Sequence, residues 1–180
     1  MIISTGCSGL RLAITEDDER RWFAVFTVPQ NEQSTARRLD MLQIESFLPT
    51  YATVRVWRNR QRKMIMQPLF PTYLFVRISP RERGRVLGSP GVLQIVGTRQ
   101  QPLPLDNSEI DFLKVYCTMK RIEPFRDLVV GEPVRIRSGA LKGLKGVLVR
   151  RSSNLRFVLT LEMINQNAAV EVDANDLERA

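Results

Sequence analysis

The stretch from Pro68 to Ile78, PLFPTYLFVRI, has the side-chain alternation that is typical of a β-strand. The alternation separates two sets of side chains: Leu74, Val76 and Ile78 on one face, and Tyr73, Phe75 and Arg77 on the other. One face of a small antiparallel sheet is normally enough to build a core. The aromatic residues on the second face therefore predict a further contact, either with a helix of the same domain or with a partner.

The flanking segments predict strands and helices in the order βαββαβα. The first four, in chain order, are a strand at 22–28, a helix over 31–43 capped by Asn31, an extended segment over 44–57 that Pro49 interrupts, and the strand within 68–78. They are followed by a short helix from Ser79 to Leu87, a strand within 89–97, and a helix capped by Asn107 or Ser108. This order is typical of an α+β sandwich, in which helices pack on one antiparallel sheet.

The composition changes after the last of these helices. Residues 120–130 carry charges and Pro124, which predicts a linker. Residues 131–180 contain short apolar runs separated by Gly and Asn, which favours a small all-β barrel. The expected organisation is a poorly ordered lead-in over residues 1–20, an α+β domain over 21–119, a linker over 120–130 and a barrel domain over 131–180.

Basic residues outnumber acidic ones, 27 to 19, which gives a net charge of +8. Such an excess favours a polyanionic partner, although basic charge can also serve solubility alone. The chain has no histidine, and its two cysteines, Cys7 and Cys117, form neither a disulfide framework nor a zinc motif. Because phosphate-binding, dinucleotide-binding and paired-carboxylate motifs are missing too, we expect no enzyme, no metal and no cofactor.

The expected location is cytoplasmic. No run of about 18 apolar residues is present, which predicts no membrane span. The start of the chain lacks a basic leader followed by an apolar core, so it does not resemble a signal peptide. Cysteines without a disulfide pattern fit a reducing compartment.

A basic segment follows the second extended region. It carries Arg55, Arg58, Arg60, Arg62 and Lys63 and no acidic residue. Phosphate contacts require only positive charge within reach, so the last four of these are candidate nucleic-acid-binding residues, the alternative being a solvated hairpin tip. Trp57 stands among them and is either a base-stacking residue or part of the core.

Several blocks of the sequence together resemble the NusG family. WFAVFTVPQNEQSTARRL, PLFPTYLFV and SPGVLQIVG resemble its N-terminal domain, and GEPVRIRSGALKGLKGVLV resembles the KOW motif that opens its C-terminal barrel. PLFPTYLFV and LTLEMINQNAAVEV look closer to the specialised RfaH-type paralogues. The resemblance implies an α+β N-terminal sandwich followed by a small KOW barrel.

The resemblance also implies binding residues in the N-terminal domain. Proteins similar to this one dock an apolar surface onto the clamp helices of RNA polymerase, and the matching residues are Phe26, Phe70, Pro71, Tyr73 and Phe75. The alternative is that a helix of the same domain covers them all. RfaH-like proteins also read non-template DNA, and the matching positions carry Gln30, Asn31, Arg83 and Arg85.

In the barrel, the resemblance implies binding of Rho or of a small-subunit ribosomal protein. The matching residues are Leu141 and Leu144, which we expect to be exposed, and Ile164, for which a place in the barrel core is the alternative. Glycines at 139, 143 and 146 predict a tight turn between two strands. RfaH-type barrels can refold as a helical hairpin, but the β-branched residues and glycines here favour the barrel.

The function implied is that of a monomeric transcription elongation and antitermination factor. It would bind the polymerase clamp and upstream or non-template DNA, and would suppress pausing or termination. The rival interpretation is a ribosome-associated RNA-binding KOW protein, since such barrels also occur in ribosomal proteins and the charge suits RNA.

Overall fold

The structure is a computed structural model. It describes residues 19–57, 60–98, 101–119, 121–125, 131–139, 141–151, 154–172 and 176–180. Most of the predicted lead-in, residues 1–18, lies outside the described residues, as does Arg58.

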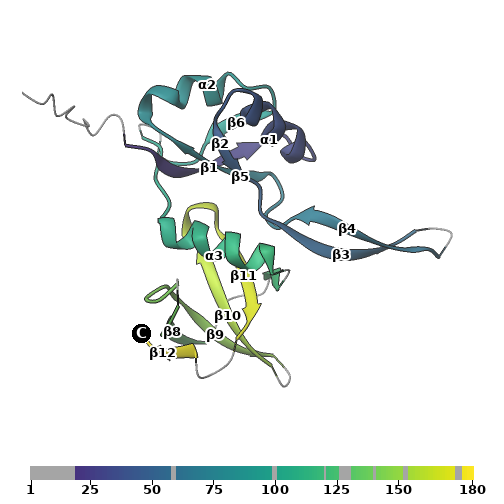
Figure 1. The fold of residues 1–180 in the computed structure, drawn as a ribbon, viewed down its shortest axis with the longest axis vertical. Coiled ribbons are helices and arrows are strands. Elements are labelled where there is room, and N and C mark those ends of the chain that lie inside the picture. The colour runs from purple at the N-terminus through teal and green to yellow at the C-terminus, as the bar shows by residue number, and fades with distance from the viewer. Residues whose placement is uncertain are drawn as a thin grey trace, which may run out of the picture.

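An antiparallel sheet of four strands forms the centre of the N-terminal domain, in the order β2-β5-β1-β6. Its strands are β1 (Arg21–Thr27), β2 (Glu45–Phe47), β5 (Tyr73–Ile78) and β6 (Val92–Ile95). Its helices are α1 (Glu32–Met41), α2 (Arg83–Leu87) and α3 (Asn107–Thr118). Helices α1 and α2 cover one face of the sheet and α3 lies on the other (Figure 1), which confirms the predicted α+β sandwich.

The alternation along β5 explains how both faces are covered. Leu74 and Val76 pack with Leu39 of α1 and Val86 of α2 in one apolar cluster. Phe75, pointing the other way, belongs to a second cluster with Trp22, Ala24 and residues of α3. The second face of this strand is therefore covered largely from within the chain, which was one of the two predicted alternatives.

The starts of α2 and α3 follow from the chemistry of their capping residues. The backbone N–H of Ser79 donates to the Glu82 carboxylate at 3.0 Å, which closes a capping box ahead of the short 3₁₀ turn η2 (Pro80–Glu82). Helix α3 has an equivalent box between Asp106 and Glu109. Its cap is thus Asp106, one residue before the first position predicted.

A long two-stranded ribbon projects from this domain (Figure 1). It consists of β3 (Thr50–Val56) and β4 (Arg62–Pro68), paired from Thr50↔Pro68 to Val56↔Arg62. Pro49 separates β2 from β3, as predicted. Part of the basic segment belongs to the ribbon, because β4 already begins at Arg62. Residues 69–72 form a turn before β5. We refer to this pair of strands as the β3–β4 ribbon.

The C-terminal part is an all-β sheet of six strands in the order β12-β8-β9-β10-β11-β7. Its strands are β7 (Ile122–Phe125), β8 (Glu132–Ile136), β9 (Lys145–Arg151), β10 (Asn154–Leu161), β11 (Gln166–Glu171) and β12 (Leu177–Arg179), with a 3₁₀ turn η3 (Glu162–Ile164) before β11. Gly139 and Gly143 have φ angles of 82° and 90°, as the predicted turn requires, whereas Gly146 lies in β9. Strand β7 pairs with β11 and lies inside residues 120–130, so the predicted linker contains a strand of the C-terminal sheet.

Helix α3 lies between the N-terminal sheet and the C-terminal barrel (Figure 1). The ring of Phe112 on α3 is 5.5 Å from the ring of Phe157 on β10, and both side chains are fully buried. One continuous apolar cluster therefore runs from Trp22 in the sheet, through α3, to the barrel core. None of the helices in the described ranges is long and apolar enough to span a bilayer.

The neighbours Tyr73 and Phe75 should differ sharply in their effect on stability. Phe75 is fully buried against Phe47 and Phe70, so Phe75→Ala is expected to lower the free energy of unfolding by about 3–5 kcal/mol. Tyr73 is only half-buried, so Tyr73→Ala should lower it by less. Urea denaturation followed by the fluorescence of Trp22, in a Trp57→Phe background, measures both. Equal losses for the two variants would contradict this assignment of the core.

Candidate functional site

A clamped turn precedes β5 and carries several of the candidate residues. Thr72 has a φ of 69°, an uncommon conformation for a β-branched residue. Its N–H donates to the carboxylate of Glu32 at 2.8 Å. Its carbonyl accepts from the backbone N–H of Thr27 at 2.8 Å and from the Thr27 hydroxyl at 3.1 Å. The side chains of Glu32 and Thr27 are buried, so the turn is held from within the domain.

Three side chains lie beside this turn, where the central strands β1 and β5 meet at one end of the sheet. Phe26 and Tyr73 are paired across β1 and β5, and their rings are 5.3 Å apart at an angle of 52°. Both are half-buried, and Pro71 beside them is exposed. We call Phe26, Pro71 and Tyr73 the aromatic surface. Apolar rings on a rigid frame, with part of their area in solvent, suit the docking of an apolar partner surface.

Two other candidates from the same set, Phe70 and Phe75, are not at the surface. Their exposed fractions are 1% and 0%, and their rings meet edge-on at 6.1 Å. Both belong to the cluster formed with α3, because the alternation of β5 turns Phe75 toward that helix. In this arrangement they support the aromatic surface from beneath.

A groove of about 590 Å³ runs beside the aromatic surface. Pro71 and Tyr73 line it on the N-terminal side, together with Tyr51 at the base of the β3–β4 ribbon. Pro124 and Phe125 of β7 line the opposite side. The candidate surface is thus partly walled by the C-terminal part of the chain.

The candidate DNA-reading residues of α1 and α2 do not form one cluster. Gln30 and Asn31 precede α1, where both are exposed and Gln30 lines the groove beside Tyr73. Arg85 donates to the backbone carbonyl of Leu42, at the opposite end of α1, and lies 4.0 Å from Glu82. Arg83 is exposed. The ten residues of α1, about 15 Å at 1.5 Å each, therefore separate the two pairs.

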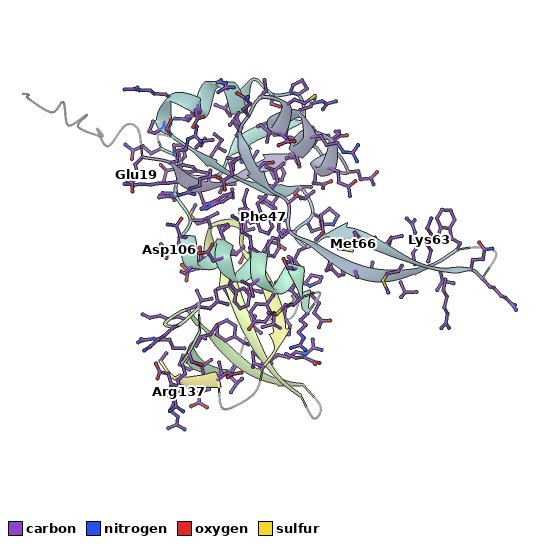
Figure 2. The ribbon with its side chains drawn as sticks, viewed as in Figure 1. Glu19, Phe47, Lys63, Met66, Asp106 and Arg137 are labelled. Atoms are coloured by element: carbon purple, nitrogen blue, oxygen red, sulfur yellow. The ribbon has the colours of Figure 1, made fainter. Side chains whose placement is uncertain are left out.

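The β3–β4 ribbon carries the candidate phosphate-binding residues that the structure describes, Arg60, Arg62 and Lys63, and all three are exposed. Lys63 lies near the tip of the ribbon and Met66 lies nearer the body (Figure 2). Cross-strand pairing places Val54 opposite Met64, and these side chains are 55% and 68% exposed. The ribbon therefore combines positive charge with apolar side chains, and both are in solvent.

The barrel candidates are buried, which corrects the expectation that the two leucines would be exposed. Leu141, Leu144 and Ile164 are 9%, 8% and 5% exposed and belong to the cluster that contains α3. Leu144 also lines a groove of about 560 Å³ beside Leu105, just before α3. This burial could not be predicted from the sequence, because an apolar residue in a barrel turn can face either solvent or a neighbouring helix.

Carboxylates gather where the start of α3 meets the barrel. Asp106, Glu109 and Glu162 line the same groove as Leu144, with Lys145 opposite. Burial raises the pKa of Glu109, its hydrogen bond with the backbone of Asp106 lowers it, and the nearby charges of Asp106 and Glu162 raise it further. Ionised Glu109 thus opposes close contact between α3 and the barrel.

Sequence reasoning missed the residues that position the surfaces. The hydrogen bond from Thr72 to Glu32 could not be predicted from the sequence, because a carboxylate in the first turn of a helix usually faces solvent. The capping box of α3 could have been found from Asp106 and Glu109, which have the required spacing. Burial raises the pKa of the Cys117 thiol to about 11, which disfavours the thiolate. No group of residues suited to a metal occurs within the described ranges.

The chain is similar to known proteins over most of its length. A family model described as transcription termination factor nusG matches residues 20–114. The transcription termination/antitermination protein NusG of Lactococcus lactis is 27% identical over 176 residues, covering 89% of this chain and 93% of that protein. The protein of the same name from Thermus thermophilus is 26% identical over 180 residues, covering 88% and 98%.

A solved structure, titled "Domain interaction in Thermotoga maritima NusG", has the same fold. It aligns with a TM-score of 0.55 at 18% identity and covers 89% of this chain and 97% of that one. The family match alone extends over more than half of the sequence. The protein is therefore a member of the NusG family.

Proposed function

We propose that this NusG-family protein binds RNA polymerase through its aromatic surface, contacts nearby DNA with its basic residues, and suppresses pausing or termination. Relatives that cover most of the chain are named transcription termination/antitermination proteins, which places the protein in transcription rather than on the ribosome. The specialised, RfaH-like character suggested by PLFPTYLFV belongs to this proposal too.

The observation that carries the proposal is the preorganised state of the aromatic surface. Three hydrogen bonds fix Thr72, and Pro71 and Tyr73 flank it directly. A surface that is ordered before binding loses little conformational entropy when it docks. Half-buried aromatic rings of this kind are typical anchors of protein interfaces. Both features suit a stable contact with an apolar element of polymerase, such as its clamp helices.

The action on transcription would follow from binding alone. A ligand shifts an equilibrium toward the state that it binds more tightly. A factor that bridges the clamp and upstream or non-template DNA favours the closed, active polymerase and so shortens pauses. Rho or a small-subunit ribosomal protein would bind the barrel at Leu141, Leu144 and Ile164, which requires those side chains to come away from α3.

Substitution of Tyr73 tests the proposed contact. In the full-length protein, Tyr73→Ala should weaken binding to purified polymerase of the same organism at least about tenfold, as expected for an anchor residue. Tyr73→Phe keeps the ring and should bind nearly as well as the wild type. Leu93→Ala, on an exposed position of β6, is the matched control. Failure of the wild type to bind, or full binding by Tyr73→Ala, would contradict the proposal.

The Glu32 clamp gives a second, independent prediction. Glu32→Ala removes the acceptor for the Thr72 N–H and should weaken polymerase binding, whereas Glu32→Gln keeps an acceptor oxygen and should stay within about twofold of the wild type. Hydrogen exchange of the Thr72 amide should be faster in the alanine variant. If Glu32→Ala exposes that amide and still binds polymerase normally, preorganisation of the turn does not matter for binding.

A further inference from the structure

The tip of the β3–β4 ribbon exposes a tryptophan. Trp57 directly follows β3 and is 55% exposed. The only other tryptophan of the chain, Trp22, is 3% exposed and lies under the ammonium group of Lys114. A fold gains much by burying so large an aromatic side chain, so an indole left in solvent on a projecting element indicates a contact surface.

The backbone of Trp57 is fixed although its side chain is exposed. Its N–H donates to the carbonyl of Gln61 at 2.9 Å, and its carbonyl accepts from the N–H of Arg60, also at 2.9 Å. Both polar backbone groups of Trp57 are therefore paired within the tip of the ribbon. No ring or cation contact to Trp57 occurs among the residues that the structure describes. The backbone that carries the indole is therefore fixed, and about half of the side chain is in solvent.

Strand register places cations on the same face as this indole. Side chains two residues apart along a strand share a face, so Arg55 and Trp57 lie together. Lys63 is paired with Arg55 across the ribbon and so lies on that face as well. The opposite face carries the apolar pair Val54 and Met64. Arg62 pairs with Val56 and lies on that opposite face too, so one face carries the indole with two cations and the other is largely apolar with one cation.

The β3–β4 ribbon carries positive charge without acidic neighbours in its own sequence. The sequence from Thr50 to Pro68 contains no acidic residue. Within the described part of the chain, the ion pairs involve none of the ribbon's cations, Arg55, Arg60, Arg62 and Lys63. A concentrated positive charge without counter-charges favours a polyanion as the partner.

We propose that the Trp57 face of the β3–β4 ribbon is a stacking platform for unpaired bases of single-stranded DNA. A base stacks on the indole while Arg55 and Lys63 bind the phosphates on either side of it. This combination of an aromatic plane with flanking cations is the general way in which proteins hold single strands without reading their sequence. The inference rests on the proposed function, because it names the DNA that a factor on transcribing polymerase would meet.

The chemistry of the tip favours a single strand over a duplex. In a duplex the bases stack on one another, so their faces are not available to an exposed indole. Only the phosphates would then interact with the ribbon, through its cations. A protein partner would instead engage the apolar face around Val54 and Met64. The two faces of the ribbon are therefore expected to respond differently to substitution.

The two tryptophans allow a direct measurement. Titration of the full-length protein with an oligothymidylate strand at low salt should quench the fluorescence of Trp57, and Trp57→Phe identifies the signal because only buried Trp22 remains. In the same assay with a dye-labelled strand, Trp57→Ala should weaken binding by about 5- to 150-fold. Arg55→Ala should reduce the slope of log affinity against log salt by about 0.7.

Met64→Ala is the matched control, because it removes an exposed apolar side chain from the opposite face and should leave the affinity unchanged. An equal loss in Met64→Ala and Trp57→Ala would overturn the assignment of the face. Equal quenching by duplex DNA, or none by the single strand, would overturn stacking. Tighter binding of an RNA strand of matched length would overturn the assignment to DNA.

The outcome is independent of the proposed polymerase contact. Trp57→Ala should bind core polymerase without nucleic acid as well as the wild type does, because the aromatic surface is untouched. Tyr73→Ala should bind the oligonucleotide normally. If the wild type does not bind polymerase, the proposed function is refuted and the quenching result still holds. If the single strand does not quench Trp57, only the proposed stacking platform is refuted.

Discussion

The arrangement of the molecule depends on one helix with two buried sides. Ile110 and Leu113 of α3 are fully buried in the cluster that includes the N-terminal sheet, and Phe112, which points the other way, meets Phe157 of the barrel. An amphipathic helix normally leaves one side to water. Because α3 is buried on both sides, the sheet and the barrel share a single apolar core. Whether a candidate binding residue is exposed depends on whether it contacts this core.

This constraint divides the family-derived binding residues into two groups. Phe26 and Tyr73 lie at the paired ends of the two central strands, with Pro71 in the turn before β5, and all three keep contact with solvent. Leu144 and Ile164, by contrast, are enclosed with α3. A partner that requires the second group competes with the helix for the same side chains. Burial and the nearby carboxylates raise the pKa of Glu109, so the contact between α3 and the barrel combines a large apolar area with a carboxylate that is costly to ionise.

Periodicity and turn chemistry predicted the elements well, because each depends on neighbouring residues. The alternation of β5, the break at Pro49 and the capped short helix at Ser79 all appear in the structure. Burial was harder to predict, since it depends on what the fold brings from afar. An aromatic strand face has the same sequence pattern whether α3 or a partner covers it. The pattern therefore could not predict that Phe75 is buried and Tyr73 only half-buried. Strand β7 was missed because Pro124 and its charges resemble a linker, yet an edge strand tolerates proline.

The pairing of β7 with β11 has a consequence for how the barrel can act. Helix α3 ends at Thr118 and β7 begins at Ile122, so only residues 119–121 connect the two parts. Three residues span at most about 10 Å when fully extended. A tether this short gives the barrel a very high effective concentration at α3. A free partner in the cell must compete with that concentration. The four residue pairs between β7 and β11 keep the tether short, so they limit how far the barrel can move from α3 to meet a partner.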